Sequence, residues 1–118
     1  MNLFKRWLWP RSVRGDALSL YKLGFACGQA NDAKGAMTAY TLAIDLADAP
    51  DDVMAMALYN RALLLAAEGA TKKALADLRA VLEMPEPLQA IKLAARRRME
   101  RFQNRQDAAA RHNLHPAT

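Results

Sequence analysis

Cys27, His112 and His115 are the side chains of this sequence best suited to nucleophilic or metal chemistry. Cys27 is the single cysteine, so it has neither a disulfide partner nor the spaced companions of a zinc site. The two histidines form an HxxH pair without a neighbouring carboxylate, and we interpret them as polar residues of a tail. The three residues predict no bound metal, an inert buried thiol and a reducing, cytoplasmic setting.

The glycines do not form a phosphate-binding loop. Gly24, Gly28 and Gly35 are spread over predicted helices, whereas a loop that cradles phosphate gathers its glycines in one turn. No serine stands with a candidate base, and no pair of carboxylates occurs in a recognisable pocket motif. We therefore expect no cofactor and no enzymatic activity.

The formal net charge of +5 is divided unevenly along the chain. Residues 1–16 carry a net charge of +3, residues 17–87 carry −3, and residues 88–118 carry +5. This asymmetry favours association with anionic surfaces but does not determine a fold. The run RRRMER at 96–101 is interpreted as a solvated helix face, with phosphate contact as the alternative, because Phe102 is the one aromatic residue beside it.

Composition and periodicity predict an all-α protein. Alanine is abundant, β-branched residues are scarce, and apolar residues recur at three- and four-residue steps. Asp16 and Asp32 are expected to cap the first two helices, Pro50 to lie in the first turn of the third with Asp51 and Asp52, and Gly69 to end it. The expected parts of the chain are a basic aromatic segment over 1–15, a helical domain over 16–110 and a disordered tail over 111–118.

The helical domain repeats itself at a fixed offset, the one that superposes Leu20 on Leu58. Small residues pair in each copy, Gly24 with Ala36 and Ala62 with Ala74. We expect each pair to meet where two antiparallel helices cross, since helices approach closely only where bulk is absent. The same offset superposes Tyr21 on Tyr59, Gly24 on Ala62, Cys27 on Leu65, Ala36 on Ala74, Tyr40 on Leu78 and Ala43 on Val81.

The two copies resemble the tetratricopeptide repeat, whose pattern is W-x2-L-G-x2-Y, then A-x3-F, then P, over about 34 residues. The resemblance covers residues 17–87. It implies an α–α superhelix of two antiparallel hairpins, at 17–50 and 55–87, closed by a capping helix at 88–110; a plain five-helix bundle is the rival. The copies read Leu20-x2-Leu23-Gly24-x2-Cys27, Ala36-x3-Tyr40, Pro50, and Leu58-x2-Arg61-Ala62-x2-Leu65, Ala74-x3-Leu78, Pro85.

Three departures separate the chain from the family pattern. The offset is longer than the family period by one helical turn, and leucine replaces the opening aromatic residue in both copies. Cys27 stands at the usual tyrosine position. The departures leave the spacing of the small residues intact, and the pattern tolerates such variation.

In this family the first helix of each hairpin lines a concave groove that holds the ligand. The register of the capping helix is ambiguous by one residue, because either Ala95 or Arg96 could stand at the crossing position that Gly24 and Ala62 occupy in the two copies. Carried over residue by residue, the groove positions are Leu18, Tyr21, Lys22, Phe25 and Gln29 in the first copy, Met56, Tyr59, Asn60, Leu63 and Ala67 in the second, and Lys92, Arg96 or Arg97, and Glu100 or Arg101 on the capping helix, of which we choose Arg97 and Arg101.

Some family members hold a C-terminal carboxylate with a clamp of lysines and asparagines. Here Asn60 alone stands at such a position, while Tyr21 and Phe25 occupy places where a lysine and an asparagine would be needed. The resemblance therefore implies that the clamp is not intact. The surface instead combines aromatic and aliphatic side chains with an arginine rim, which suits an amphipathic or acidic peptide.

These features predict a non-catalytic protein-interaction module, an adaptor or scaffold that binds a peptide or partner domain in the groove. One alternative is that the aromatic residues pack between helices and bind nothing. A second is a binder of nucleic acid or of an anionic membrane surface through the basic ends. A third is a structural subunit whose groove is filled by its own oligomer, since two repeats are few for independent stability.

The N-terminal segment carries both tryptophans of the chain. As a helix it would place apolar side chains on one face and cations away from it, which suits docking on the same or a sister chain or, second, a peripheral membrane anchor. Lys5, Arg6 and Pro10 interrupt it, so it is not a signal peptide, and no apolar run reaches the ~20 residues of a membrane span. The residues of this docking segment are Leu3, Phe4, Trp7, Leu8 and Trp9.

Overall fold

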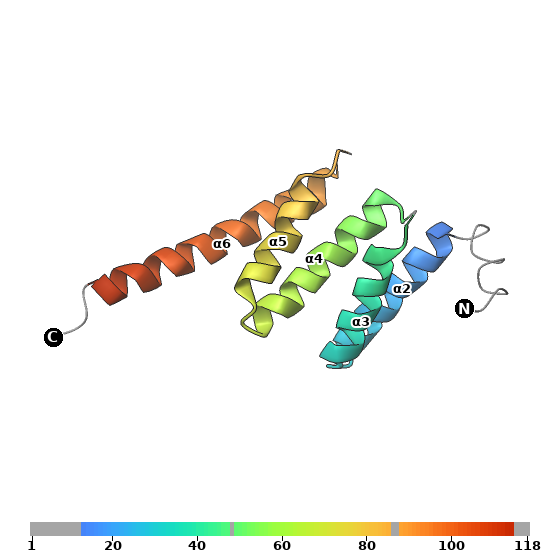
Figure 1. Cartoon of the computed structure of the whole chain (residues 1–118), viewed down its shortest axis with the longest axis horizontal. Helices are drawn as coiled ribbons and strands as arrows, with labels where there is room; N and C mark the ends of the chain where they lie inside the picture. The colour runs from blue at the N-terminus through green and yellow to red at the C-terminus, as the bar shows by residue number, and fades with distance from the viewer. Residues whose placement is uncertain (1–12, 48, 86–87, 115–118) are drawn as a thin grey trace.

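The computed structural model describes residues 13–47, 49–85 and 88–114, and every regular element among them is an α-helix. This confirms the expected all-α class. Figure 1 shows the helices in chain order, from blue to red. They are α2 (Val13–Gln29), α3 (Ala33–Asp45), α4 (Asp51–Ala67), α5 (Thr71–Leu82) and α6 (Gln89–Leu114).

Local signals set most of the helix ends. The Asp32 side chain accepts a hydrogen bond from the backbone amide of Gly35 at 2.9 Å and caps α3, as predicted. Asn31, with φ of 62°, and Gly69, with φ of 83°, adopt the left-handed conformation that stops α2 and α4. Asp51 lies in the first turn of α4, where a carboxylate complements the helix dipole.

Two predicted helix boundaries are wrong. α2 begins at Val13, so Asp16 lies in its first turn and is not its cap. α6 continues to Leu114, because neither proline nor glycine occurs between the predicted end at Ala110 and Leu114. The predicted disordered tail over 111–118 is therefore helical over residues 111–114.

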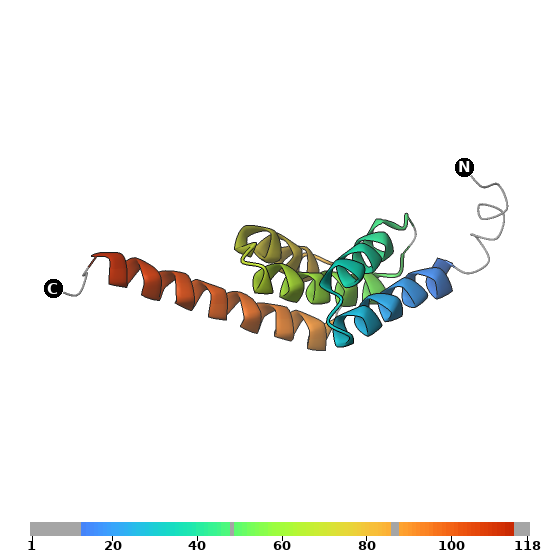
Figure 2. The ribbon, with the colours of Figure 1, turned by 90° about the horizontal axis from the view of Figure 1, so that it is seen from below.

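The helices pack as two hairpins followed by a single helix. α2 packs on α3 and α4 packs on α5. α4 also contacts both helices of the first hairpin, and α6 contacts both helices of the second. In Figure 2, α3 and α5 lie along one side of the molecule and α2 and α6 along the other, with α4 between them. α6 thus bears the same relation to the second hairpin as α4 bears to the first.

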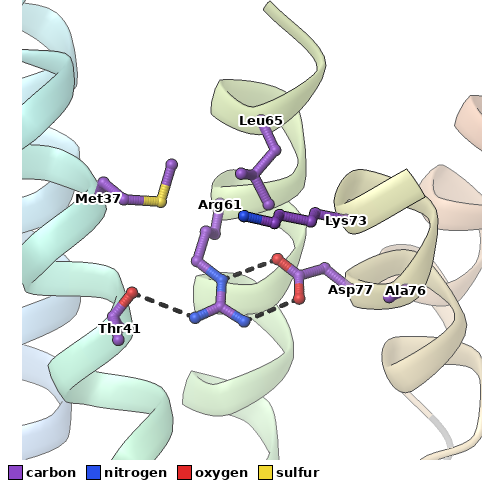
Figure 3. A pocket seen from close by; sticks show the side chains of 7 residues that line it. All are labelled: Met37, Thr41, Arg61, Leu65, Lys73, Ala76 and Asp77. Carbon is purple, nitrogen blue, oxygen red and sulfur yellow. Dashed lines mark hydrogen bonds and ion pairs between the residues drawn. The ribbon is translucent and has the colours of Figure 1, made fainter. Parts of the chain in front are cut away.

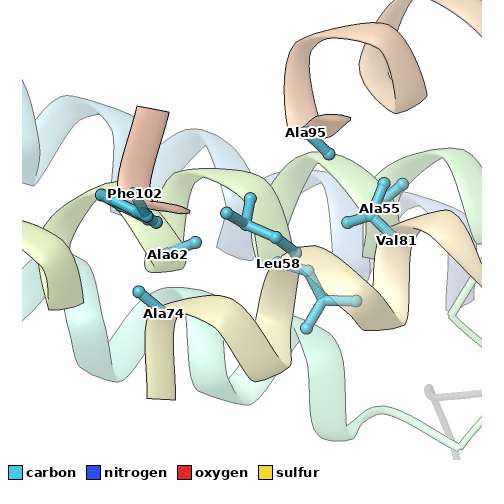
Figure 4. Packing of buried hydrophobic residues seen from close by; sticks show 8 residues of the cluster. Ala55, Leu58, Ala62, Ala74, Val81, Ala95 and Phe102 are labelled. Atoms are coloured by element: carbon cyan, nitrogen blue, oxygen red, sulfur yellow. The ribbon is translucent and has the colours of Figure 1, made fainter. Parts of the chain in front are cut away.

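The buried clusters repeat with the same offset as the sequence. The first hairpin and α4 bury Ala36, Tyr40, Ala43 and Ala57 together. The equivalent residues, Ala74, Leu78, Val81 and Ala95, are buried together between the second hairpin and α6, in the cluster of Figure 4. The half-buried neighbours Leu20, Tyr21, Cys27, Ile44 and Leu64 likewise correspond to Leu58, Tyr59, Leu65, Leu82 and Phe102. The repeat in the sequence is therefore a repeat of packing.

This correspondence fixes the register of α6. Ala95 is fully buried and Arg96 is exposed. Ala95 and Phe102 occupy the positions that Ala57 and Leu64 occupy on α4, so Ala95 faces back toward α5. Of the two residues left open for the crossing position, Ala95 is therefore the buried one, and α6 has no following helix among the described residues.

The face of α6 that points away from α4 and α5 is polar. Arg96 and Glu100 are exposed there, at positions where α4 carries the buried Leu58 and Ala62. Leu93 is 44% exposed at the position of the fully buried Ala55. A terminal helix of a stacked array needs such a solvated face, since no further repeat covers it.

Gly24 allows a close approach of α3 to α2. A methyl group on Gly24 would lie 2.6 Å from the Cδ1 and Cε1 atoms of Tyr40, which is 3% exposed. The nearest neighbour of Gly24 is therefore the ring of Tyr40, whereas the spacing predicted Ala36. In the second hairpin Ala62 and Ala74 share one buried cluster, as predicted (Figure 4).

Candidate interaction surface

Tyr21 is the centre of the surface that α2 and α4 build. Its ring lies 6.5 Å from that of Phe25 and 5.8 Å from that of Tyr40, and both pairs are tilted. These separations are in the range of favourable aromatic contacts. Its hydroxyl accepts a hydrogen bond from Nδ2 of Asn60 at 3.3 Å. Tyr21 of α2 and Asn60 of α4, both predicted groove residues, are therefore in contact.

Asn60 is held from within the molecule. Its Nδ2 also donates to the backbone carbonyl of Met56 at 2.8 Å, so both amide hydrogens have partners. An asparagine that clamps a ligand carboxylate must donate these hydrogens to the ligand. Asn60 therefore positions Tyr21, and its carbonyl oxygen is the group left for a ligand.

The other predicted residues differ in exposure. Lys22 and Gln29 are exposed on α2, and Phe25 is 47% exposed. On α4, Tyr59 is half-buried against the cluster between the second hairpin and α6. Leu18, Met56 and Leu63 are also half-buried, Ala67 is exposed, and Arg97 and Arg101 are exposed on α6. We call the positions on α2 and α4 the tyrosine face: Leu18, Tyr21, Lys22, Phe25, Gln29, Met56, Tyr59, Asn60, Leu63 and Ala67.

The docking segment with Leu3, Phe4, Trp7, Leu8 and Trp9 lies outside the described residues. Within the described ranges, none of the helices is both long and apolar enough to cross a membrane. The same part of the chain holds no group of three or more His, Cys, Asp or Glu side chains arranged for a metal.

Cys27 is half-buried, whereas the sequence predicted a buried thiol. A methyl group on Gly35 would lie 3.1 Å from its sulfur, so the thiol packs against the first turn of α3. It lies away from the tyrosine face.

A pocket of about 320 Å³ lies on the opposite side, between α3, α4 and α5 (Figure 3). Arg61 crosses it and donates two hydrogen bonds to Asp77, from Nε and Nη2, each at 2.8 Å. Its Nη1 donates to the Thr41 hydroxyl at 3.1 Å. The hydrogen bonds to Asp77 raise the pKa of Arg61. The ion pair with Asp77 therefore stabilises the charged form of the guanidinium. Met37, Leu65, Lys73 and Ala76 complete the lining.

This arrangement ties three helices together. Thr41 belongs to the first hairpin and Asp77 to the second, and Arg61 of α4 bridges them. It was not predicted from the sequence, where Arg61 was quoted only as a residue of the second repeat copy. A signal was present, since a cation in an otherwise apolar stretch of helix needs a partner.

Tyr40 should give the fold a pH dependence at alkaline pH. Burial, and after it the neighbouring Tyr21 and Cys27, raise the pKa of Tyr40 from 10.0 to about 12. The unfolded chain loses this proton first, so the stability contributed by the neutral phenol is lost as pH rises from 10 to about 12. We expect the urea midpoint to fall over that window, and to fall less in Tyr40→Phe. Equal slopes for the two proteins would contradict this.

Comparison with models of protein families, with curated proteins and with solved structures finds no match for this chain. The interpretation of the tyrosine face therefore depends on the contacts within the molecule. Those contacts give it two properties that matter for binding. It has an exposed aromatic ring, and it has a hydrogen bond that fixes the neighbouring tyrosine across two helices.

Proposed function

We propose that this chain is a non-catalytic protein-interaction module of the tetratricopeptide type. It binds a peptide or a partner domain on the tyrosine face. The observation that carries the proposal is the half-exposed Phe25 beside Tyr21, whose hydroxyl is held by Asn60 of the next hairpin. Aromatic side chains of this kind dominate the binding energy of protein interfaces.

The fixed position of Tyr21 favours binding. Immobilising a flexible side chain at an interface costs about 0.5–1.5 kcal/mol, and a ring that is already held avoids most of this cost. Tyr21 packs against Tyr40 on its inner side and Phe25 on its outer side. The surface is therefore formed before a ligand arrives.

The packing repeat supports the tetratricopeptide assignment. Two hairpins are stacked so that equivalent residues are buried in equivalent contacts, and a polar helix covers the last of them. Stacked arrays of this kind use the extended surface formed by one helix of each hairpin to bind partners. A half-buried single cysteine without a disulfide also suits work in the reducing cytoplasm.

The test compares two exposed apolar residues on different helices. Phe25→Ser removes the ring from the tyrosine face, while Leu42→Ser changes a side chain of α3 that is 51% exposed. We expect Phe25→Ser to weaken capture of the partner from an extract of the source cells about tenfold or more, as loss of an aromatic anchor does. Leu42→Ser should capture it like the unchanged chain. Tyr59 is left intact because it packs against the core.

Circular dichroism must show the same helix content for both variants. Equal recovery of the partner by the two variants would contradict the proposal. Loss of the partner in Leu42→Ser alone would assign the function to the side of α3 and α5 instead.

A further inference from the structure

The tyrosine face continues onto α6, and there it becomes a row of arginines. The burial of Ala95 and Phe102 fixes the register, because these two residues take the places of Ala57 and Leu64. In that register the positions of Tyr59, Asn60, Leu63 and Ala67 on α4 correspond to Arg97, Arg98, Arg101 and Arg105 on α6. We call these four residues the arginine row.

Acidic residues are absent from this extended face. The chain has 12 Asp and Glu residues, yet none stands on the tyrosine face or in the arginine row. The two acidic residues of α6, Glu100 and Asp107, correspond to Ala62 and Gly69, which are not positions of the face. A helix face with interspersed positive and negative side chains would be equally soluble. The separation of the arginines from the acidic residues of α6 therefore indicates that the arginines bind a ligand.

Three of the four arginines in this row have no ion-pair partner in the part of the chain that the structure describes. Arg97, Arg98 and Arg101 make no ion pair with any described residue, in contrast to Arg61 with its bidentate carboxylate. Arg97 and Arg101 are exposed. Arg105 lies 5.1 Å from the centre of the Phe102 ring, which orients its guanidinium beside the core.

We infer that the ligand of this face is an amphipathic peptide segment that is polarised along its length. Its apolar residues lie on α2 and α4, and its acidic residues lie against the arginine row of α6. The inference rests on the proposed function and adds the chemistry and the direction of the ligand. It requires internal Asp or Glu side chains and not a terminal carboxylate, since Asn60 donates both amide hydrogens within the molecule.

A peptide fits this surface better than a nucleic acid does. The half of the face on α2 and α4 is mostly aromatic and aliphatic, with the neutral polar residues Gln29 and Asn60 and with Lys22 as its one cation. A nucleic acid places phosphates along its whole length, and outside α6 it would meet Lys22 as the one cation of this face. An acidic peptide matches both halves, because its composition is free to change along the chain.

The experiment is a selection of random 16-residue peptides displayed on phage, performed on the immobilised full chain. We expect the enriched peptides to combine apolar residues with Asp or Glu, and to lose binding to Phe25→Ser. Arg97→Gln with Arg101→Gln should weaken a selected peptide about three- to tenfold at low salt and less at high salt, as exposed ion pairs do. The matched control is Lys72→Gln with Arg79→Gln, two exposed cations of α5, which should leave affinity unchanged.

The outcomes separate the inference from the proposed function. Peptides that depend on Phe25 but lack acidic residues, or ignore the Arg97 and Arg101 changes, would overturn the inference and leave the function standing. An absence of any peptide that depends on Phe25 would overturn both. Tighter binding of a poly-uridine RNA, lost in the Arg97/Arg101 variant, would replace the acidic peptide with a nucleic acid.

Discussion

Replacing Gly24 by alanine should lower the free energy of unfolding, whereas the same replacement at Gly28 on the same helix should raise it. A methyl group on Gly24 would lie 2.6 Å from two ring atoms of the buried Tyr40. Overpacking of this kind costs about 1–3 kcal/mol, and the better helix propensity of alanine offsets up to about 1 kcal/mol of it. We expect a net loss of about 1–2 kcal/mol in urea unfolding followed by circular dichroism.

Gly28 is the matched control because a methyl group there meets nothing within 4 Å. Gly28→Ala should therefore gain about 0.5 kcal/mol from helix propensity alone. Destabilisation by both replacements, or by neither, would contradict the close packing of Tyr40 on Gly24.

The second hairpin suggests a second substitution that should restore the stability lost in Gly24→Ala. At the positions of Gly24 and Tyr40 it carries Ala62 and Leu78, both fully buried, so a larger residue on one helix accompanies a smaller one on the other. Gly24→Ala combined with Tyr40→Leu copies this pair. The double variant should be more stable than the sum of the single effects predicts, by about 0.5–3 kcal/mol, as coupled neighbours are.

The second large effect concerns Arg61. Arg61→Met removes three hydrogen bonds of the guanidinium, two to Asp77 and one to Thr41, and leaves Asp77, whose side chain is 9% exposed, without its cation. An unpaired buried carboxylate and a lost charged hydrogen bond together cost about 2–4 kcal/mol. We expect a loss of that size in the free energy of unfolding, measured with urea.

The partner residues should respond less. Asp77→Ala should cost less than Arg61→Met, because the Arg61 side chain keeps 21% exposure and can turn its guanidinium toward water. Thr41→Val removes a single hydrogen bond between the hairpins and should cost about 0.5–1.5 kcal/mol. A smaller effect of Arg61→Met than of Asp77→Ala would contradict the assignment of Asp77 as the less accessible partner.

Helix positions followed from the sequence where local chemistry decides them. Asp32 has the side chain to cap α3, and Gly69 has the freedom to end α4, so short stretches were sufficient. The end of α6 was predicted wrongly because such a local signal is missing there. Between Ala110 and Pro116 no residue of the sequence stops a helix.

Contacts between distant residues were predicted only in part. The spacing of the small residues within a copy correctly paired Ala62 with Ala74. Spacing does not determine which way a large ring turns, and the ring of Tyr40 lies over Gly24. Arg61 and Asp77 lie on two different helices, so no local pattern joins them. On the tyrosine face, the sequence chose Tyr21 and Asn60 without indicating that they bond to each other.

We expect ligands to bind the face formed by α2, α4 and α6. Nuclear magnetic resonance of the 15N-labelled chain tests this expectation. Asn60 and Arg61 are neighbours in sequence, but the Asn60 side chain bonds to Tyr21 of α2 and the Arg61 side chain bonds to Thr41 of α3. On addition of a selected peptide, the side-chain amide signals of Asn60 should shift and the Nε signal of Arg61 should stay. A shift of the Arg61 signal with an unchanged Asn60 would place the ligand at the pocket between α3 and α5 and contradict this expectation.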